Sequence, residues 1–149
     1  MAILGFKKLE ELFRKSASLD IKKGHAKALT DIIEQKLVDL MIAGERSANI
    51  HNMDIITEGD LPITKGLQEA IIEFRKLEDE IDAQDVLNYL ATIPPLKYPL
   101  SVELEAKLPE ITGAILLVLA RLMKAINQQK REVTHELIDE SKEVLDLLL

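Results

Sequence analysis

The sequence of 149 residues contains no cysteine. This absence excludes a disulfide framework, a thiolate metal site and a cysteine nucleophile. It fits a reducing cytoplasm, where disulfides are rare, and we therefore expect a cytoplasmic protein.

Long apolar runs are missing as well. The most apolar segment, residues 113–123, is interrupted by Arg121 and is shorter than the roughly 20 apolar residues that cross a bilayer. Only a few apolar residues precede Lys7 and Lys8, whereas a secretory signal needs a longer apolar region behind a basic start. We expect neither a leader nor an association with the membrane.

Signatures of catalysis are missing too. There is no Gly-rich phosphate loop, and no serine lies in a nucleophile-elbow context. His25 and His51 lie at opposite ends of one expected helix, roughly 39 Å apart, so they cannot share a ligand. His135 and Asp139 have an i,i+4 spacing that a metal could use, but they also fit an ordinary exposed acidic face. We expect a protein that is not an enzyme, with no cofactor, metal or small-molecule substrate.

The net charge of −7 is unevenly distributed. Residues 1–77 contain 12 basic and 12 acidic residues, whereas residues 78–149 contain 7 and 14 and carry the whole excess. This balance does not favour a polyanion as the partner. The acidic cluster in residues 78–85 is either a soluble linker or a docking site for a basic partner.

The sequence does contain apolar residues at helical spacing. Its length suits one compact domain, residues 1–149. Residues 6–13 have the apolar spacing of a short amphipathic helix. A helix of about seven turns is predicted for residues 23–49. Its apolar positions are Leu29, Ile33, Leu37, Leu40, Gly44 and Ala48. Gly44 is costly inside a helix, so we expect a close approach of other backbone there.

A short extended segment, residues 54–56, is followed by a predicted third helix. Thr57 and Asp60 match the capping-box pattern, so the helix is expected to begin at Thr57 and to run through Phe74. Pro62 would then fall in its first turns, where proline is tolerated.

The second half repeats this order. It contains a predicted short helix in residues 82–93, a proline-rich loop, a second long helix, an extended segment at residues 131–133 and a final helix capped by Thr134. Pro109 either starts the second long helix or kinks it, and we favour the kink. The apolar C-terminal "EVLDLLL" is either core or a contact between molecules. A shift of 77 residues aligns the two halves, which indicates two copies of one unit, about residues 1–77 and 78–149.

This order resembles the histone fold, in which two helix–strand–helix units clasp head to tail. The stretches "DLPITKGLQE" at residues 60–69, "IPPL" at 93–96 and "LPEITGAIL" at 108–116 are similar to a prokaryotic family of single-chain, tandem histone-fold proteins. The resemblance covers nearly the whole chain. It implies an all-α fold in which the two units form an intramolecular pseudo-dimer, and it carries no settled biochemical function.

The resemblance also implies that each extended segment pairs with the first loop of the other unit. Residues 54–56 would lie beside Lys97 and Tyr98, and residues 131–133 beside Ile21 and Lys22. Phosphate contacts would come from the paired loops and the start of the first helix. The candidate DNA-binding residues are therefore Lys7, Lys8, Lys22, Lys23, Lys130 and Arg131.

The DNA-binding pattern of histones is incomplete here. The resemblance implies an arginine–threonine pair at each second loop, but the first unit has Met53 and Ile55 there and the second has Lys130 and Glu132. About six cations opposed by nearby acids predict weak, salt-sensitive binding at most, or simply solvated surface charges. We expect a binding or assembly module that acts through protein–protein interaction or self-association. Weak, sequence-nonspecific DNA binding is the alternative.

Overall fold

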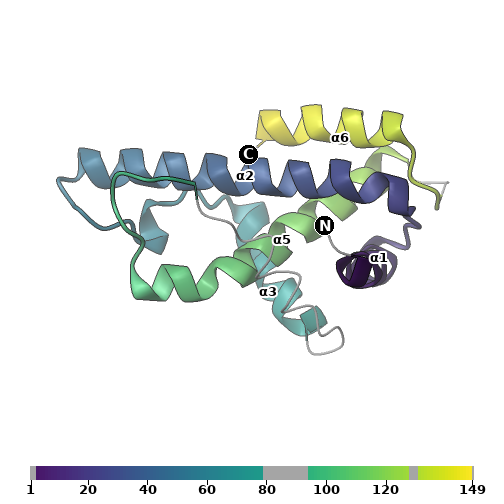
Figure 1. Ribbon diagram of the computed structural model, residues 1–149, viewed down its shortest axis with the longest axis horizontal. Helices are drawn as coiled ribbons and strands as arrows, with labels where there is room; N and C mark the ends of the chain where they lie inside the picture. Colours follow the sequence, from purple (N-terminus) through teal and green to yellow (C-terminus); the bar gives the residue numbers. More distant parts are fainter. Residues whose placement is uncertain (1–2, 79–93, 128–130, 149) are drawn as a thin grey trace.

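The computed structural model describes residues 3–78, 94–127 and 131–148 (Figure 1). Every regular element in these ranges is helical, which confirms the predicted all-α class. The elements are α1 (Ile3–Ala17), α2 (Lys23–Ile50), the 3₁₀ turn η1 (Glu58–Asp60), α3 (Lys65–Glu78), α5 (Val102–Ile126) and α6 (His135–Leu148). None of the described helices is long and apolar enough to span a membrane. The short helix predicted for residues 82–93 lies outside the described ranges.

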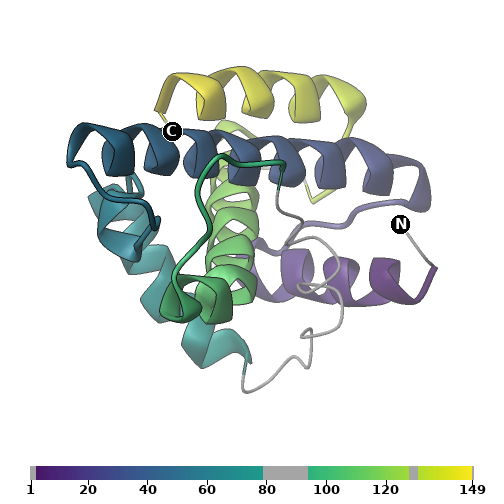
Figure 2. The ribbon, with the colours of Figure 1, turned by 60° about the vertical axis from the view of Figure 1, so that its left-hand side comes forward.

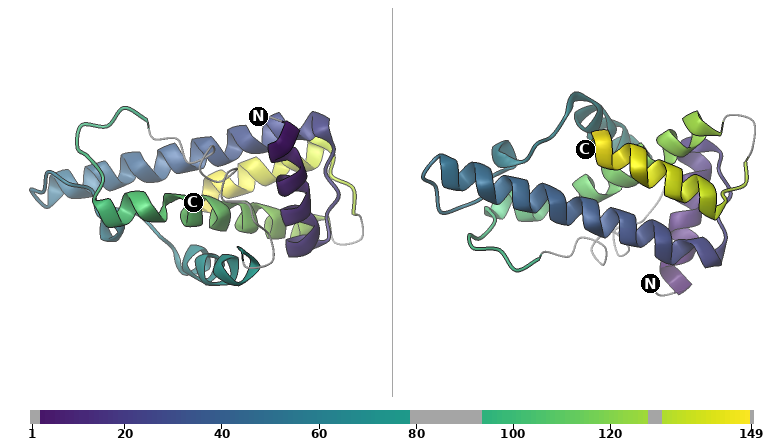
Figure 3. Two further views of the ribbon diagram at one scale, coloured as in Figure 1. Left: turned by 60° about the horizontal axis from the view of Figure 1, so that its bottom comes forward. Right: turned by 90° about the horizontal axis from the view of Figure 1, so that it is seen from above.

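The long helix α2 organises the molecule. It has α6 on one side and α1, α3 and α5 on the other (Figure 1). Figure 2 shows α5 crossing α2 steeply, and Figure 3 shows α6 lying obliquely along α2. One apolar core draws on all five of these helices. The positions predicted to face inward from α2, such as Leu29 and Leu37, are fully buried in it, as apolar periodicity requires.

Two isolated parallel pairings tie remote segments together at the ends of α2. Before its start, the Asp20 amide donates to the Arg131 carbonyl at 2.7 Å, and the Val133 amide donates to the Asp20 carbonyl at 3.1 Å. Residues 131–133 were expected beside Ile21 and Lys22, so the register prediction was wrong. The backbone of Lys22 is engaged elsewhere, because its amide donates to His25 Nδ1 and its carbonyl accepts from the His25 amide, and the pairing falls on Asp20.

The second pairing follows the end of α2. The Ile56 amide donates to the Pro99 carbonyl at 2.9 Å, and the Ser101 amide donates to the Ile56 carbonyl at 2.8 Å. Pairing with Lys97 and Tyr98 was therefore also the wrong register. The amides of those two residues instead donate to the Glu45 carboxylate on α2, so they are not available to Ile56.

The third helix begins later than predicted. Thr57 and Asp60 close only η1, in which the Thr57 amide donates to the Asp60 carboxylate at 2.9 Å. Pro62 disfavours a helical conformation at the residue before it and supplies no amide, so α3 starts beyond it. Its cap is Thr64, whose hydroxyl accepts from the Leu67 amide at 3.2 Å. The expectation that Thr57 begins the helix and that Pro62 lies inside it was wrong.

The helices of the second half begin with side-chain caps. The Ser101 hydroxyl accepts from the Leu104 amide at 3.1 Å at the start of α5, and Thr134 accepts from the Leu137 amide at 3.1 Å, which confirms the predicted cap of α6. Pro109 lies inside α5 and does not start it. The ribbon of α5 changes direction within its first half (Figure 2). The missing proline amide favours such a bend, as does the hydrogen bond from the Thr112 hydroxyl to the Leu108 carbonyl at 2.7 Å.

Two glycines permit close packing. A Cβ atom on Gly44 would lie 2.7 Å from Leu61 Cδ2 and 3.1 Å from Ile56 Cγ2, whereas the nearest backbone atom, the Asp60 carbonyl oxygen, is 3.9 Å away. Gly44 therefore makes room for side chains more than for the backbone that was expected there. A Cβ atom on Gly113 would lie 2.5 Å from Phe74 Cε1, inside the van der Waals contact distance. The ring of Phe74 therefore packs directly on the backbone of α5.

Candidate functional site

The two pairings create two surfaces at opposite ends of α2. The first, which we call the α2-start surface, contains Lys22, Lys23 and Arg131 around Asp20. The second, the α2-end surface, contains Ile50, Met53, Ile55 and Val102. A helix of 28 residues separates them, a distance of about 42 Å.

Part of the predicted DNA site is assembled at the α2-start surface. Pairing of Asp20 with Arg131 brings Arg131 beside Lys22 and Lys23, and all three basic residues are exposed. Lys130 lies outside the described residues. Lys7 is exposed and Lys8 half-buried on α1, and no ion pair or hydrogen bond in the described ranges joins either to this surface.

An acidic residue sits among these cations. Asp20 Oδ1 lies 3.8 Å from Arg14 Nε, and Asp20 Oδ2 lies 3.9 Å from Arg131 Nε. The carboxylate therefore offsets part of the positive charge that a phosphate would meet. Sequence reasoning missed this arrangement because Arg14 and Arg131 meet Asp20 only through the fold. Lys22 and Lys23 have no ion-pair partner among the described residues.

Two histidines meet just behind this surface. The rings of His25 and His135 contact edge to face, with centroids 4.7 Å apart, and His25 Nδ1 accepts from the Lys22 amide at 3.4 Å. Burial lowers the pKa of His25, and the nearby charges of His135 and Lys22 lower it further. Sequence reasoning missed the contact, although His25 lies four residues before Leu29 on the buried face of α2. In the described residues, no three His, Asp or Glu side chains gather as a metal would need.

The α2-end surface is apolar. Ile50 is 68% exposed, Met53 52%, Ile55 42% and Val102 81%. Because Ile56 pairs with Leu100, Ile55 and Val102 lie at the same end of the molecule. Isolated exposed apolar residues are common, but four of them near the end of α2 and the start of α5 identify a candidate contact surface.

A buried lysine joins α2 to α6. Lys36 is 5% exposed, and its ammonium lies 2.5 Å from Asp146 Oδ1 and 3.3 Å from Asp39 Oδ2. The hydrogen bond from Lys36 is the main cause of the lowered pKa of Asp146. The sequence held a signal for this burial, because position 36 lies three residues after Ile33 and four before Leu40. The Lys36 ammonium is held by the two carboxylates, so this arrangement joins α2 to α6.

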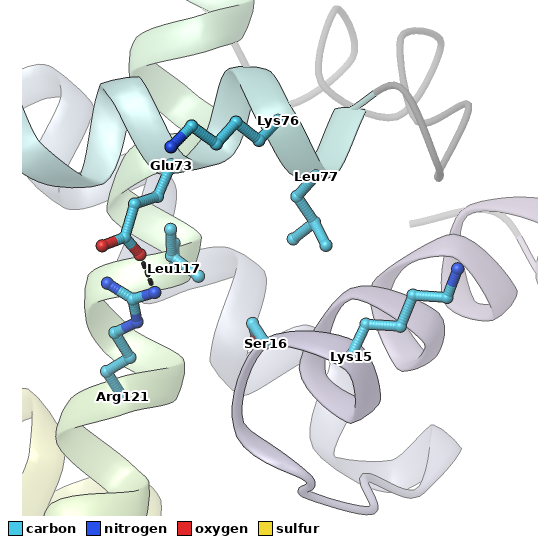
Figure 4. A pocket seen from close by; sticks show the side chains of 7 residues that line it. All are labelled: Lys15, Ser16, Glu73, Lys76, Leu77, Leu117 and Arg121. Atoms are coloured by element: carbon cyan, nitrogen blue, oxygen red, sulfur yellow. Dashed lines mark hydrogen bonds and ion pairs between the residues drawn. The ribbon is translucent and has the colours of Figure 1, made fainter.

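A hollow of about 370 Å³ lies between α1, α3 and α5 (Figure 4). Its charged side chains do not converge: Lys15 and Lys76 extend in opposite directions, and Arg121 is paired with Glu73. The side chain of Leu77 points into the gap. A reacting group needs donors and acceptors aimed at one point, so this arrangement does not support catalysis.

Residues 9–146 match a family model described as "Domain of unknown function (DUF1931)". The chain belongs to this family. Two proteins of Aquifex aeolicus (strain VF5), each described as uncharacterized, are 29% and 31% identical to it. Their alignments cover 85% and 95% of this chain and 74% and 89% of the relatives.

Two crystal structures show the same fold as this DUF1931 chain. A Thermus thermophilus protein superposes with a TM-score of 0.87 at 36% identity, covering 96% of this chain and 97% of its own. An Aquifex aeolicus protein superposes with a TM-score of 0.85 at 27% identity, covering all of both chains. This chain therefore shares its helical arrangement with both of these proteins.

Proposed function

We propose that the chain is a histone-type pair within one polypeptide, a compact domain of two helix–strand–helix units at about residues 1–77 and 78–149. The described helices support this: α1, α2 and α3 have 15, 28 and 14 residues, and α5 and α6 have 25 and 14. The two parallel pairings each join a segment of one unit to a segment of the other. An experimental structure tests the proposal, because α2–α3 must then superpose on α5–α6 by a two-fold rotation.

We propose further that this pair is a binding or assembly module whose partner is a protein, and that it is not an enzyme. The observation that carries the proposal is the α2-end surface. Where the resemblance to histones implies arginine and threonine facing phosphate, Met53 and Ile55 present apolar side chains to solvent. Burial of exposed apolar surface drives protein association, whereas it adds nothing to phosphate binding.

DNA binding is the alternative, and the α2-start surface is where it would occur. Lys22 and Lys23 favour it, but Asp20 stands between Arg14 and Arg131 and weakens the local field. Firm binding usually needs about six to ten phosphate contacts, and this surface offers fewer. We expect weak duplex binding that is lost as salt is added.

Photocrosslinking tests the protein-binding proposal. A photoreactive residue at position 53, introduced in cells of the source organism, is expected to give one or a few discrete protein adducts. The same residue at the exposed position 65 on α3 is the control and should not give them. A purified partner identified in this way should bind a variant carrying Met53→Glu and Ile55→Glu at least about tenfold more weakly. Undiminished binding by that variant contradicts the proposal.

A duplex-DNA titration tests the alternative. Weak binding at low salt should disappear when Lys22, Lys23 and Arg131 are changed together to glutamate. Tight binding that survives about 200 mM salt would reverse the ranking of the two functions, because that much salt removes weak phosphate contacts. Complete absence of binding in about 20 mM salt would eliminate the DNA alternative.

A further inference from the structure

The two histidines behind the α2-start surface join the starts of two helices. Both α2 and α6 begin at this end of the molecule (Figure 1). His25 lies in the first turn of α2, and His135 is the first residue of α6. Their rings meet edge to face at 4.7 Å, with His25 only 8% exposed and His135 at the surface. The contact therefore links two segments that are remote in the sequence.

This arrangement requires a neutral His25. Its Nδ1 atom accepts from the Lys22 amide at 3.4 Å, and its own amide donates to the Lys22 carbonyl at 2.9 Å. An imidazolium ring donates from both nitrogens and accepts from neither. Protonation of His25 would therefore remove the acceptor of the Lys22 amide. It would also place a positive charge beside His135 and the Lys22 ammonium.

No carboxylate in the described part of the chain forms an ion pair or a hydrogen bond with either ring. The Asp20 carboxylate is shared by Arg14, at the end of α1, and Arg131. The last turn of α5 contributes Lys124, a further cation. The remaining charged groups at the two helix starts are Lys23, Glu132, Glu136 and Asp139, which are all exposed. A charged His25 would thus be buried among cations without a partner of opposite sign.

We propose that protonation of this histidine pair releases the start of α6 from α2, while the end of α6 stays attached. The end is held by the ion pair of Lys36 with Asp146 at 2.5 Å, which involves no histidine. The hydrogen bond from Lys36 lowers the pKa of Asp146 below its ordinary 3.8, so this carboxylate keeps its charge in mild acid. Only the start of the helix then responds to a change from neutral to mildly acidic solution.

Release of the α6 start would take the α2-start surface apart. The Val133 amide would leave the Asp20 carbonyl, and Arg131 would separate from the other two cations of that surface. Leu137 and Ile138, which are buried in the first turn of α6, would become accessible. In mild acid the domain would exchange a cationic surface for an apolar one. This response does not depend on the proposed protein partner.

Hydrogen exchange of the full chain tests the proposal, because amide protection measures how often a segment opens. If His25 is neutral in the closed form and regains its ordinary pKa of 6.5 in the open form, opening should increase by at most about thirtyfold at about pH 5. After correction for intrinsic exchange, the amides of Leu137 and Ile138 should therefore lose several-fold to about thirtyfold of their protection between about pH 7 and about pH 5. The amide of Phe74 in α3 should keep its protection.

His25→Asn is the deciding variant, because the asparagine carbonyl oxygen can accept from the Lys22 amide and does not titrate. Its α6 amides should be equally protected at both pH values. His51→Asn is the matched control, since His51 is exposed at the other end of α2, and this variant should lose protection like wild type.

The proposal is overturned by three results: no loss in the wild-type protein, an equal loss in His25→Asn, or an equal loss in α3. A nuclear magnetic resonance titration of the wild-type protein supplies a second test that needs no variant. The His25 ring and the Val133 amide should titrate with one midpoint, and two separate midpoints would also overturn the proposal.

Discussion

Gly113→Ala should destabilise the protein, although alanine is the better helix former. Gly113 lies within α5, and the ring of Phe74 from α3 rests on it. A Cβ atom built at Gly113 would lie 2.5 Å from both Cε1 and Cε2 of that ring. Carbon atoms in favourable contact are about 3.5–4.0 Å apart, so the added methyl group overlaps the ring by about 1 Å.

The expected change in the free energy of unfolding follows from two opposing effects. Alanine is favoured over glycine in a helix interior by about 1 kcal/mol. Overpacking a core costs about 1–3 kcal/mol, and the upper end applies here because Phe74 is only 1% exposed and cannot swing into solvent. We therefore expect a net loss of about 2 kcal/mol in the free energy of unfolding.

Urea unfolding followed by far-UV circular dichroism measures this change. Gly66→Ala on α3 is the control, because a Cβ atom there has nothing within 4 Å, and its effect should stay within about 0.5 kcal/mol of wild type. Phe74→Leu in the Gly113→Ala background should cost less than the sum of the two single changes, since the smaller side chain relieves the overlap. A Gly113→Ala protein as stable as the Gly66→Ala protein would refute the reasoning.

Three further outcomes are expected in the same unfolding assay. Gly44→Ala should lose less than about 1 kcal/mol, because the side chain closest to its new methyl group ends in a movable methyl of its own. Asp146→Asn should lose about 1–3 kcal/mol at neutral pH, since the buried Lys36 keeps one other carboxylate. Because the folded-state pKa of Asp146 is lowered from its ordinary 3.8, its contribution is complete above that pH, and the difference from wild type should shrink as pH falls below it. The pKa of His25, which is lowered mainly by burial, likewise means that its contribution to stability is complete above pH 6.5 and declines as pH falls below it. His25→Asn should flatten this decline, and an equal slope in both proteins would contradict its assignment to the buried His25.

Local sequence patterns predicted a helix well where its apolar residues repeat along one face. The spacing from Leu29 to Ala48 located α2, and the Thr134 cap is where it was expected. Thr57 shows where such patterns fail. The same local signal closes only a 3₁₀ turn there, because Pro62 supplies no amide and disfavours a helical conformation at Leu61.

Contacts between remote segments were harder to predict. The extended segments pair where expected in general, but their registers differ by one or more residues. At Lys97 and Tyr98 the reason is a remote side chain, because the Glu45 carboxylate accepts from both amides. The cationic cluster of Lys22, Lys23 and Arg131 was predicted, whereas the ion pairs of Asp20 with two arginines were not. Periodicity shows which face of a helix is buried. It does not show which charge from another helix will face it.

The backbone pairing of Asp20 with Glu132 has a consequence for biosynthesis. A ribosome releases the N-terminal anchor of α2 well before Glu132, the residue with which Asp20 pairs. Until then the side of α2 that α6 covers stays exposed, and contacts this remote in sequence form slowly. Slowing translation between α5 and α6 should therefore increase the fraction of chains that aggregates.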